Sequence, residues 1–426
     1  MPRFEKPAEG SWTEHYPELG TGPVSYHDCI SPEFHEEEAE AVFGRAWLLM
    51  GRVEDVPAVG SFVTREIEVL KSSIIIVRGQ DDRIRAFHNF CRHRGNKILW
   101  NHSPHEQAQG TCRAFTCKYH GWRYGLDGSL EFVQQEDQFF DLDKRQHGLV
   151  PVHCDTWGGF VFVNLAEEPE QSLADYLGPT LGALGDYPFH LMTERYEYRA
   201  DIRCNWKIYC DASQEFYHAP ILHSQEATPA TRARGQEMGF EAPYYQLEGP
   251  HRLVSTVGAP RRLWPEEYRY LMETAFRSGL MGPWDAPDLG PEPPGVNPGG
   301  LRKWEMTNFQ IFPNVQLLVQ ETGWYILYRY WPTGYNTHRF EAWHAFTPST
   351  KASERAAREC SAVMNKDFTL QDAATLEGTQ RALESRRSRE TFPLCDQEVL
   401  VRHLHKTVGD WVEDWRAKRA GGGQHG

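Results

Sequence analysis

The chain has 426 residues, 40% hydrophobic and 24% charged, which is the composition of an ordinary soluble globular protein with length for roughly two or three domains. Its formal net charge of −14 argues against nucleic acid as a partner, because a phosphate-binding surface needs clustered Lys and Arg. No apolar run approaches the ~18 residues that span a bilayer, and the N-terminus carries charges and prolines in place of an apolar signal sequence, so we expect a cytoplasmic protein without membrane contact.

Residues 1–46 are predicted to form an arm followed by a helix. Ser31 and Pro32 supply an N-cap and a proline at the first helical position, and FHEEEAEAVFGRAW continues as an amphipathic helix. From residue 47 to residue 165 the pattern changes to short β-type runs, SFVTREI, SSIIIVRG, IRAFHNF and WGGFVFVNL, with Gly and Asp turns between them. This pattern predicts a small antiparallel β domain.

Two Cys/His pairs lie within this predicted β domain. Cys91 and His93 form one pair in FCRHRG, and Cys117 and His120 form the other in CKYHGW. Two thiolates and two imidazoles suit tetrahedral zinc, and they equally suit a [2Fe–2S] cluster in which two histidines replace two cysteines on one iron. Spacing alone leaves both open. Of the nine cysteines, Cys112 fits neither pair, and the other six are interpreted as buried small hydrophobes.

Residues 166–420 are predicted to form a second domain, and its first predicted helix is SLADYLGPTLGALGDY. The segment NWKIYCDASQEFYHAPILH follows at 205–223. If it begins as a helix, Glu215 and His218 share a face, and Pro220 ends or kinks the helix so that His223 meets His218. Two imidazoles beside a carboxylate indicate a metal site that lacks a ligand, and two unrelated histidines at a helix end are the alternative.

The rest of this domain is predicted from its periodicity and its Pro and Gly content. The runs NFQIFPNVQLLVQ, WYILYRYWP and RFEAWHAF favour an antiparallel sheet, and Lys351–Ser385 and Asp396–Ala417 favour helices. Leu280–Gly300 is rich in Pro and Gly and is interpreted as a lid or a disordered excursion, and residues 421–426 as a disordered tail. The aromatic candidates for lining an apolar pocket are Trp264, Tyr268, Tyr270 and Trp284.

The motifs resemble those of one enzyme family over nearly the whole chain. Cys-x-His-Arg-Gly and Cys-x-x-His-Gly-Trp, with GLDGSL at Gly125–Leu130, resemble the cluster-binding loops of Rieske proteins, which implies a [2Fe–2S] cluster on the four Cys and His residues. Asn-Trp-Lys followed by Glu-x-x-His and His-x4-His resembles the iron segment of the Rieske non-heme iron oxygenases, the aromatic ring-hydroxylating dioxygenase large (alpha) subunit family. The resemblance implies an α+β protein, with an N-terminal all-β Rieske domain and a C-terminal helix-grip catalytic domain of antiparallel sheet and helices.

The resemblance also implies which residues hold a mononuclear Fe(II). In the family, two such histidines, here His218 and His223, act with one downstream carboxylate. The family pattern places that acid five residues before a Glu and eight before a Gln. Asp372 fits this pattern, with Glu377 and Gln380 behind it, whereas Asp367 is the second choice.

Two further acids receive roles from the same resemblance. Glu215 would bridge His218 and His120 of the partner subunit, accepting hydrogen bonds from both metal-bound imidazoles. Many members carry Asp here, so the longer Glu is a departure. Asp211 stands where members such as the naphthalene-type dioxygenases have Asn close to the iron. An acid there either favours a cationic or hydroxyl-bearing substrate or makes a hydrogen bond behind the ligands.

The resemblance implies a terminal oxygenase that uses O2 to cis-dihydroxylate or monohydroxylate an aromatic or other largely apolar substrate in aromatic hydrocarbon catabolism. The sequence contains no convincing flavin or nicotinamide fingerprint, so NAD(P)H electrons are expected through a separate reductase, with or without a ferredoxin. The expected assembly is a trimer of alpha chains, with or without a small beta subunit. The alternatives are an N- or O-demethylating monooxygenase of an amine or ether, a non-enzymatic Rieske electron carrier, and a zinc-stabilised ligand-binding protein.

Overall fold

The structure is a computed structural model that describes residues 11–223, 241–257, 287–302, 304–321, 323–385 and 390–422. The chain forms two compact units. We refer to Ala39–Tyr176 as the β unit and to Met1–Glu38 with Leu177–Gly426 as the α+β unit. The four aromatic candidates for pocket lining, and residues 280–286 of the predicted lid, lie outside the described residues.

The β unit contains a seven-stranded antiparallel sheet in the order β2-β11-β10-β5-β4-β3-β6. Its strand β4 carries Ile74–Val77, a wholly buried run of β-branched side chains, as suits a strand paired on both sides. A three-stranded sheet, β7-β8-β9, belongs to the same unit. The strands are β2 (Leu48–Arg52), β3 (Ser61–Ile67), β4 (Ser72–Arg78), β5 (Ile84–His88), β6 (Gln109–Thr111), β7 (Phe115–Thr116), β8 (Arg123–Tyr124), β9 (Leu130–Phe132), β10 (Pro151–Trp157) and β11 (Phe160–Asn164).

The α+β unit is built on a second seven-stranded antiparallel sheet, in the order β12-β18-β17-β16-β15-β14-β13. Every residue of β15 and β16 is buried, so both faces of the sheet are covered at its centre. The strands are β12 (Glu194–Ile202), β13 (Glu241–Glu248), β14 (His251–Val257), β15 (Trp304–Ile311), β16 (Val315–Gln320), β17 (Trp324–Gly334) and β18 (Thr337–Phe346).

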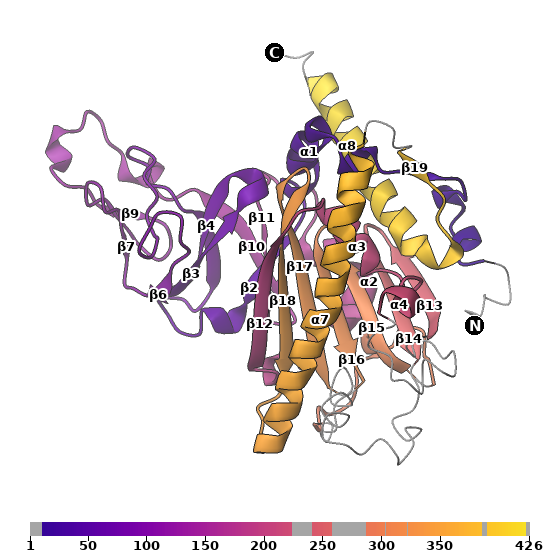
Figure 1. The fold of residues 1–426 in the computed structure, drawn as a ribbon. Helices are drawn as coiled ribbons and strands as arrows, with labels where there is room; N and C mark the ends of the chain where they lie inside the picture. The colour runs from indigo at the N-terminus through magenta and orange to yellow at the C-terminus, as the bar shows by residue number, and fades with distance from the viewer. Residues whose placement is uncertain are drawn as a thin grey trace. The chain divides into compact units, whose positions relative to one another are not determined.

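The helices of the α+β unit place its functional segments on this sheet. The long helix α7 (Ala352–Leu383) runs along one face, and α3 (Trp206–Ala212) contacts α7, β17 and α8 (Val399–Gly422) (Figure 1). Short elements described in this unit include α1 (Pro32–Glu38), α4 (Ala219–Leu222) and the ribbon of β1 (Val24–Ser25) with β19 (Thr391–Phe392). Helix α2 (Leu173–Leu184) leads into the unit and is kinked at Gly178. No helix among the described residues is long and apolar enough to cross a membrane.

Most predicted elements are confirmed, including the four runs expected as strands in the β unit and the helix at 351–385. Two predictions were wrong in extent. The helix expected to continue to residue 47 changes to a π-helical turn at Ala39–Phe43, and the tail expected from residue 421 is still helical at 421 and 422, because α8 continues to Gly422. Strands β12, β13 and β14 were not predicted. In β12 exposed charged residues interrupt the apolar ones, as suits a strand at the edge of a sheet.

Candidate metal centres

Two loops of the β unit carry the paired Cys and His residues, and their backbones close in the same way. The N–H of Gly95 donates to the carbonyl of Cys91 (2.9 Å), and that of Gly121 donates to the carbonyl of Cys117 (3.0 Å). In each loop the cysteine N–H donates in turn to the residue after that glycine. Both glycines have positive φ, 71° and 75°, which only glycine adopts without strain. Sequence segments with different Cys-to-His spacing thus form two matching loops.

The four side chains lie as a thiol pair and an imidazole pair. Cys91 and Cys117 are buried and close enough to interact, and burial, the largest influence, raises the pKa of Cys91. The ring centroids of His93 and His120 are 4.7 Å apart, and the buried Nδ1 of His93 has no hydrogen-bond partner among the described residues. Two sulfurs together and two imidazoles together suit a [2Fe–2S] cluster with two thiolates on one iron and two histidines on the other.

Tyr124 is a functional residue that the sequence analysis missed. Its hydroxyl oxygen accepts the N–H of Arg92 (3.0 Å) and lies 3.1 Å from the sulfur of Cys91. Since the hydroxyl already accepts from a backbone N–H, its own proton is free to point at the sulfur. Hydrogen bonds to cluster sulfurs help to set the reduction potential, so Tyr124 would tune a cluster held here. The sequence carried no local signal for this role, because a buried core tyrosine could occupy the same position.

The segment at 205–223 does not form the single helix expected. Helix α3 begins after Asn205, whose side chain caps the N–H of Lys207 (2.9 Å), and it ends at Ala212. Glu215 and His218 therefore meet across a turn and not on a helix face. Pro220 lies in the first turn of α4, where its missing N–H costs nothing, so the proline begins a helix and does not end one.

His218, His223 and Asp372 converge despite this correction. The Nε2 atoms of the two histidines are 3.2 Å apart. Asp372 Oδ1 lies 3.6 Å from His218 Nε2 and 3.3 Å from His223 Nε2. The three atoms lie within 4.8 Å of one another, close enough to hold one metal ion. Asp372 Oδ1 is buried and has no hydrogen-bond partner among the described residues. Two imidazole nitrogens and one otherwise unpartnered carboxylate oxygen are the donor set of a two-histidine, one-carboxylate iron site.

In both histidines the other ring nitrogen, Nδ1, faces a hydrogen-bond acceptor. His218 Nδ1 lies 2.5 Å from Glu215 Oε1, and His223 Nδ1 lies 2.9 Å from Gln371 Oε1. Each acceptor fixes the proton on Nδ1, which leaves Nε2 free to bind metal. Burial lowers the pKa of His218, but Glu215 and Asp372 together outweigh it, and the pKa is raised. Gln371 was missed, although it directly precedes Asp372.

The Glu and Gln of the family pattern connect α7 to the start of α3. Glu377 Oε1 accepts the N–H of Arg203 (3.0 Å), and Gln380 Oε1 accepts the N–H of Asn205 (2.9 Å). These bonds set the helix that carries Asp372 against the segment that leads to the histidines. The second choice, Asp367, is exposed and lies outside the convergent group.

The turn after α3 is fastened to the sheet through Ser213. Its carbonyl accepts the side-chain amides of Asn308 (2.9 Å) and Gln316 (2.8 Å), and its hydroxyl accepts the phenol of Tyr330 (2.8 Å). These buried amides explain why β15 and β16 carry polar residues at positions that are fully enclosed. The turn to Glu215 thus starts from a fixed point.

Asp211 was expected beside the iron, and its hydrogen bonds lie elsewhere. Its Oδ2 accepts the hydroxyl of Tyr26 (3.0 Å) and lies 3.0 Å from His405 Nε2. None of the candidate iron ligands is among its hydrogen-bond partners. No local pattern pointed to His405, because it lies 194 residues away from Asp211, on α8.

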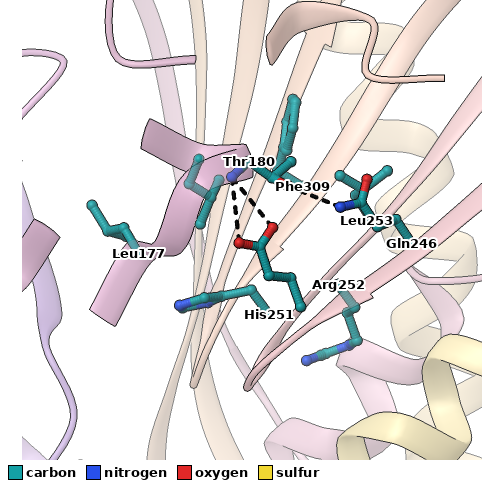
Figure 2. A pocket seen from close by; sticks show the side chains of 9 residues that line it. Leu177, Thr180, Gln246, His251, Arg252, Leu253 and Phe309 are labelled. Carbon is teal, nitrogen blue, oxygen red and sulfur yellow. Dashed lines mark hydrogen bonds between the residues drawn. The ribbon is translucent and has the colours of Figure 1, made fainter. Parts of the chain in front are cut away.

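A small cavity lies elsewhere in the α+β unit, between α2 and strands β13 to β15 (Figure 2). The N–H of Thr180 donates to both oxygens of Glu248 (3.4 and 3.3 Å), and Gln246 donates to the hydroxyl of Thr180 (2.9 Å). Gly178, with φ of 70°, makes room for Glu248, because a Cβ there would lie 2.6 Å from Oε1. None of the residues that line this cavity is a candidate metal ligand. The lining is Leu177, Thr180, Leu181, Gln246, Glu248, His251, Arg252, Leu253 and Phe309.

Two family models match separate parts of the chain. "Ring hydroxylating alpha subunit (catalytic domain)" matches residues 189–414, more than half of the chain, and "Rieske [2Fe-2S] domain" matches residues 46–151.

Two relatives and one solved structure place the chain among known proteins. The glycine betaine monooxygenase oxygenase subunit of Chromohalobacter salexigens is 34% identical over 46% of this chain and 41% of its own. The biphenyl 2,3-dioxygenase alpha subunit of Rhodococcus jostii is 34% identical over 57% of this chain and 54% of its own. The chain thus spans about half the length of these curated relatives. A solved quaternary ammonium Rieske monooxygenase, at 19% identity, shares the fold, with a TM-score of 0.71 over 96% of this chain and 100% of its own.

Proposed function

The chain belongs to the Rieske non-heme iron oxygenase family of ring-hydroxylating alpha subunits, and we propose that it is the terminal oxygenase of a system that hydroxylates a small organic substrate with O2. The family's cofactors are a [2Fe–2S] cluster and a mononuclear iron. The observation that carries the proposal is the convergence of His218, His223 and Asp372 in a chain that also holds two matched Cys/His loops. We assign the cluster to residues 47–165 and the iron to residues 166–420.

Side chains of both units would hold the two metal centres. Cys91, His93, Cys117 and His120 would hold the cluster, and the three convergent residues would hold the iron on one side, leaving positions open for O2. When bound, the two centres together supply the electrons that activate O2. Electrons from NAD(P)H would enter through a separate reductase, with or without a ferredoxin.

The substrate class follows from the relatives' names and not from described pocket residues. Aromatic hydrocarbon catabolism, expected from the sequence, is not supported, because the relatives matched first are named for glycine betaine. We propose an N-methylated amine or quaternary ammonium compound. Hydroxylation of an N-methyl carbon inserts one oxygen atom, the other leaves as water after two electrons and two protons, and the carbinol then releases formaldehyde. Ring cis-dihydroxylation is the second candidate, favoured by the biphenyl dioxygenase relative.

Labelled oxygen separates the two candidates. Purified protein reduced by dithionite would be mixed with 18O2 and either glycine betaine or biphenyl, and products analysed by mass spectrometry. The proposal expects formaldehyde release from glycine betaine in proportion to reduced protein. A dihydrodiol from biphenyl carrying two labelled atoms would favour the second candidate. No labelled product from either probe, or from a wider panel of amines and arenes, would contradict the oxygenase function.

The proposed assembly is a trimer of alpha chains, in which Glu215 bridges His218 and His120 of the partner subunit. Each unit carries exposed apolar residues next to its metal-binding segment, Tyr217 (59% exposed) and Ile221 (82%) on one and Tyr119 (53%) on the other. Such residues suit an interface between copies. A small beta subunit remains a further candidate partner. Sedimentation of the active protein tests the trimer, and full activity in a monomer would contradict it.

A further inference from the structure

A buried histidine of α8 lies between two carboxylates from distant parts of the α+β unit. His405 Nδ1 is 3.1 Å from Asp28 Oδ2, and His405 Nε2 is 3.0 Å from Asp211 Oδ2, with the histidine side chain only 4% exposed. A neutral imidazole carries one N–H, so its second nitrogen would turn a lone pair towards a carboxylate. With both carboxylates ionised, both contacts are favourable only when both nitrogens carry protons. The geometry therefore favours an imidazolium.

The surrounding charges also need this cation. Lys207 and Glu38 are fully buried and paired at 2.6 Å, and Lys207 Nζ lies 3.8 Å from Asp28 Oδ2. Asp28, Asp211 and Glu38 face Lys207 and a protonated His405, and Arg252 and Glu398, which also act on Asp211, add one charge of each sign. A neutral His405 would take one cation from this network, and an unpaired buried charge is costly.

A metal ion fits this place less well than a proton. Asp28, Cys29 and His405 lie close enough to hold an ion. Both ring nitrogens of His405, however, already face carboxylates, and the ammonium of Lys207 lies beside Asp28. A second cation would displace the protons and meet the lysine charge.

The network is connected to the iron segment through α3. Asp211 lies in the last turn of α3, and its carbonyl accepts the N–H of Gln214 (3.0 Å). The next residue is Glu215, which holds His218. On the opposite side, Tyr209 of α3 donates to the carbonyl of Thr369 (2.6 Å), one turn before Asp372 on α7. A shift of α3 would thus move the histidine segment relative to the carboxylate ligand.

We propose that His405, as an imidazolium clamped between Asp28 and Asp211, is a positioning residue that holds α3 and thereby the iron-binding segment. The inference rests on the proposed iron site and goes beyond it, because it assigns a role to a residue of α8 that contacts no candidate ligand. This role depends on the charge of His405 and not only on its packing.

The ionisation of the network agrees with the geometry. Burial, the largest influence, lowers the pKa of His405, but Asp28 and Asp211 outweigh it and raise the pKa to about 10. Burial raises the pKa of Asp28, but His405 and Lys207 outweigh this effect, so the pKa of Asp28 lies below its ordinary value. Beyond His405, Lys207, Glu38 and the two aspartates, the titratable groups described as acting on the network are Tyr26, Cys29, His35, Cys204, Cys210, Arg252 and Glu398.

The pH window follows from the sign of the shift. A pKa raised by folding stabilises the folded state fully below the ordinary value near 6.5 and loses that effect as pH rises through about 10. His403 provides a matched control on the same helix. Its Nε2 lies 3.0 Å from the carbonyl of Gly249, and burial, the largest influence, lowers its pKa to about 3, so it is neutral throughout this window.

The test compares the Fe(II) affinity of full-length, cluster-loaded proteins, measured anaerobically at pH 7.5. The proteins are the wild type, His405→Gln, His405→Gln with Asp28→Asn, and His403→Gln. We expect His405→Gln to weaken iron binding by up to about tenfold, the lower end of the loss caused by removing a group bonded directly to a metal ligand, because His405 acts only through α3. Adding Asp28→Asn removes the unpaired charge and should restore most of the affinity. His403→Gln should bind as wild type does. The visible spectrum of the cluster, in the other unit, should be the same in all four.

Two results would overturn the proposal: unchanged affinity in His405→Gln, or equal loss in the single and double variants, which would indicate packing alone. A wild-type protein that binds no Fe(II) would instead overturn the proposed iron site and this inference with it.

A second measurement needs neither iron nor the His405 variant. In iron-free protein, Asp28→Asn leaves His405 facing one carboxylate, so its pKa must fall. The free energy of unfolding of this variant, followed by urea titration from pH 6.5 to 10.5, should lose its pH-dependent part at a lower pH than wild type. An unshifted profile would show that His405 is not the charged group and would overturn the proposal even if His405→Gln failed to fold.

Discussion

Replacing Asp372 by Asn removes the one carboxylate of the convergent group while keeping its size. If the residue is an iron ligand, the change abolishes most of the stabilisation that iron gives to the fold. At free Fe(II) near one hundred times the dissociation constant, binding stabilises the folded state by about 2.7 kcal/mol. For a unit of about 290 residues, with an unfolding entropy of about 2.1 cal/mol/K per residue, that corresponds to a shift of about 4–5 °C in the unfolding midpoint. A hundredfold loss of affinity at the same Fe(II) would leave about 0.4 kcal/mol, a shift of about 1 °C.

The assay is anaerobic thermal unfolding with and without Fe(II), followed by tryptophan fluorescence. Asp367→Asn is the matched control, because it makes the same chemical change on the same helix at an exposed position. In the iron-free protein Asp372 Oδ1 has no hydrogen-bond partner among the described residues and contributes only its attraction to the two imidazoles, so the iron-free midpoint of Asp372→Asn should fall little. An iron-dependent shift retained in Asp372→Asn, or lost in Asp367→Asn, would refute the ligand assignment.

Three other changes test the surroundings of the two centres. Gln371→Leu removes the acceptor of His223 Nδ1 and should weaken Fe(II) binding by about 10–100-fold, whereas Gln371→Glu should not; equal affinities in titrations of the two variants would argue against this role. Glu215→Gln should keep both metals but slow reoxidation of the cluster in stopped-flow single turnovers, and an unchanged rate would remove the bridge. Lys207→Met leaves Glu38 buried and unpaired and should cost about 3–5 kcal/mol in urea unfolding, most of it recovered in the double variant with Glu38→Leu; no recovery would contradict the charge argument.

The cluster loops were the most predictable part of the site, because the whole constellation lies in short continuous segments. Cys91 and His93, like Cys117 and His120, are local in sequence, and each loop closes on its own glycine. Tyr124, which turns its hydroxyl to the sulfur of Cys91, has no such local mark. A tyrosine at that position is equally consistent with a buried core residue until the distance is known.

The iron segment shows where periodicity misleads. Three-residue spacing between Glu215 and His218 predicted a shared helix face, but the helix ends at Ala212. The two side chains still meet, because Glu215 Oε2 accepts the backbone N–H groups of Tyr217 and His218 and so folds the turn around itself. The pairing was therefore predictable from short separation, whereas the conformation that produces it was not.

The network around His405 was not predictable from a single sequence. It joins Asp28, Asp211 and a helix near the C-terminus, and none of these lies near another along the chain. Strands β12 to β14 were missed for a related reason: charged edge residues and polar core positions hide the alternation that indicates a strand. Contacts over long separations are decided by packing, which one sequence does not display.

The most direct test of the central claim is the ratio of iron to acid-labile sulfide in anaerobically purified protein. A chain that holds both a [2Fe–2S] cluster and a mononuclear iron should contain about three irons for every two sulfides. Replacement of Asp372 should lower that ratio to about one without changing the sulfide content. About two irons for two sulfides in the wild-type protein would contradict the oxygenase and favour an electron carrier, and zinc without sulfide would contradict both.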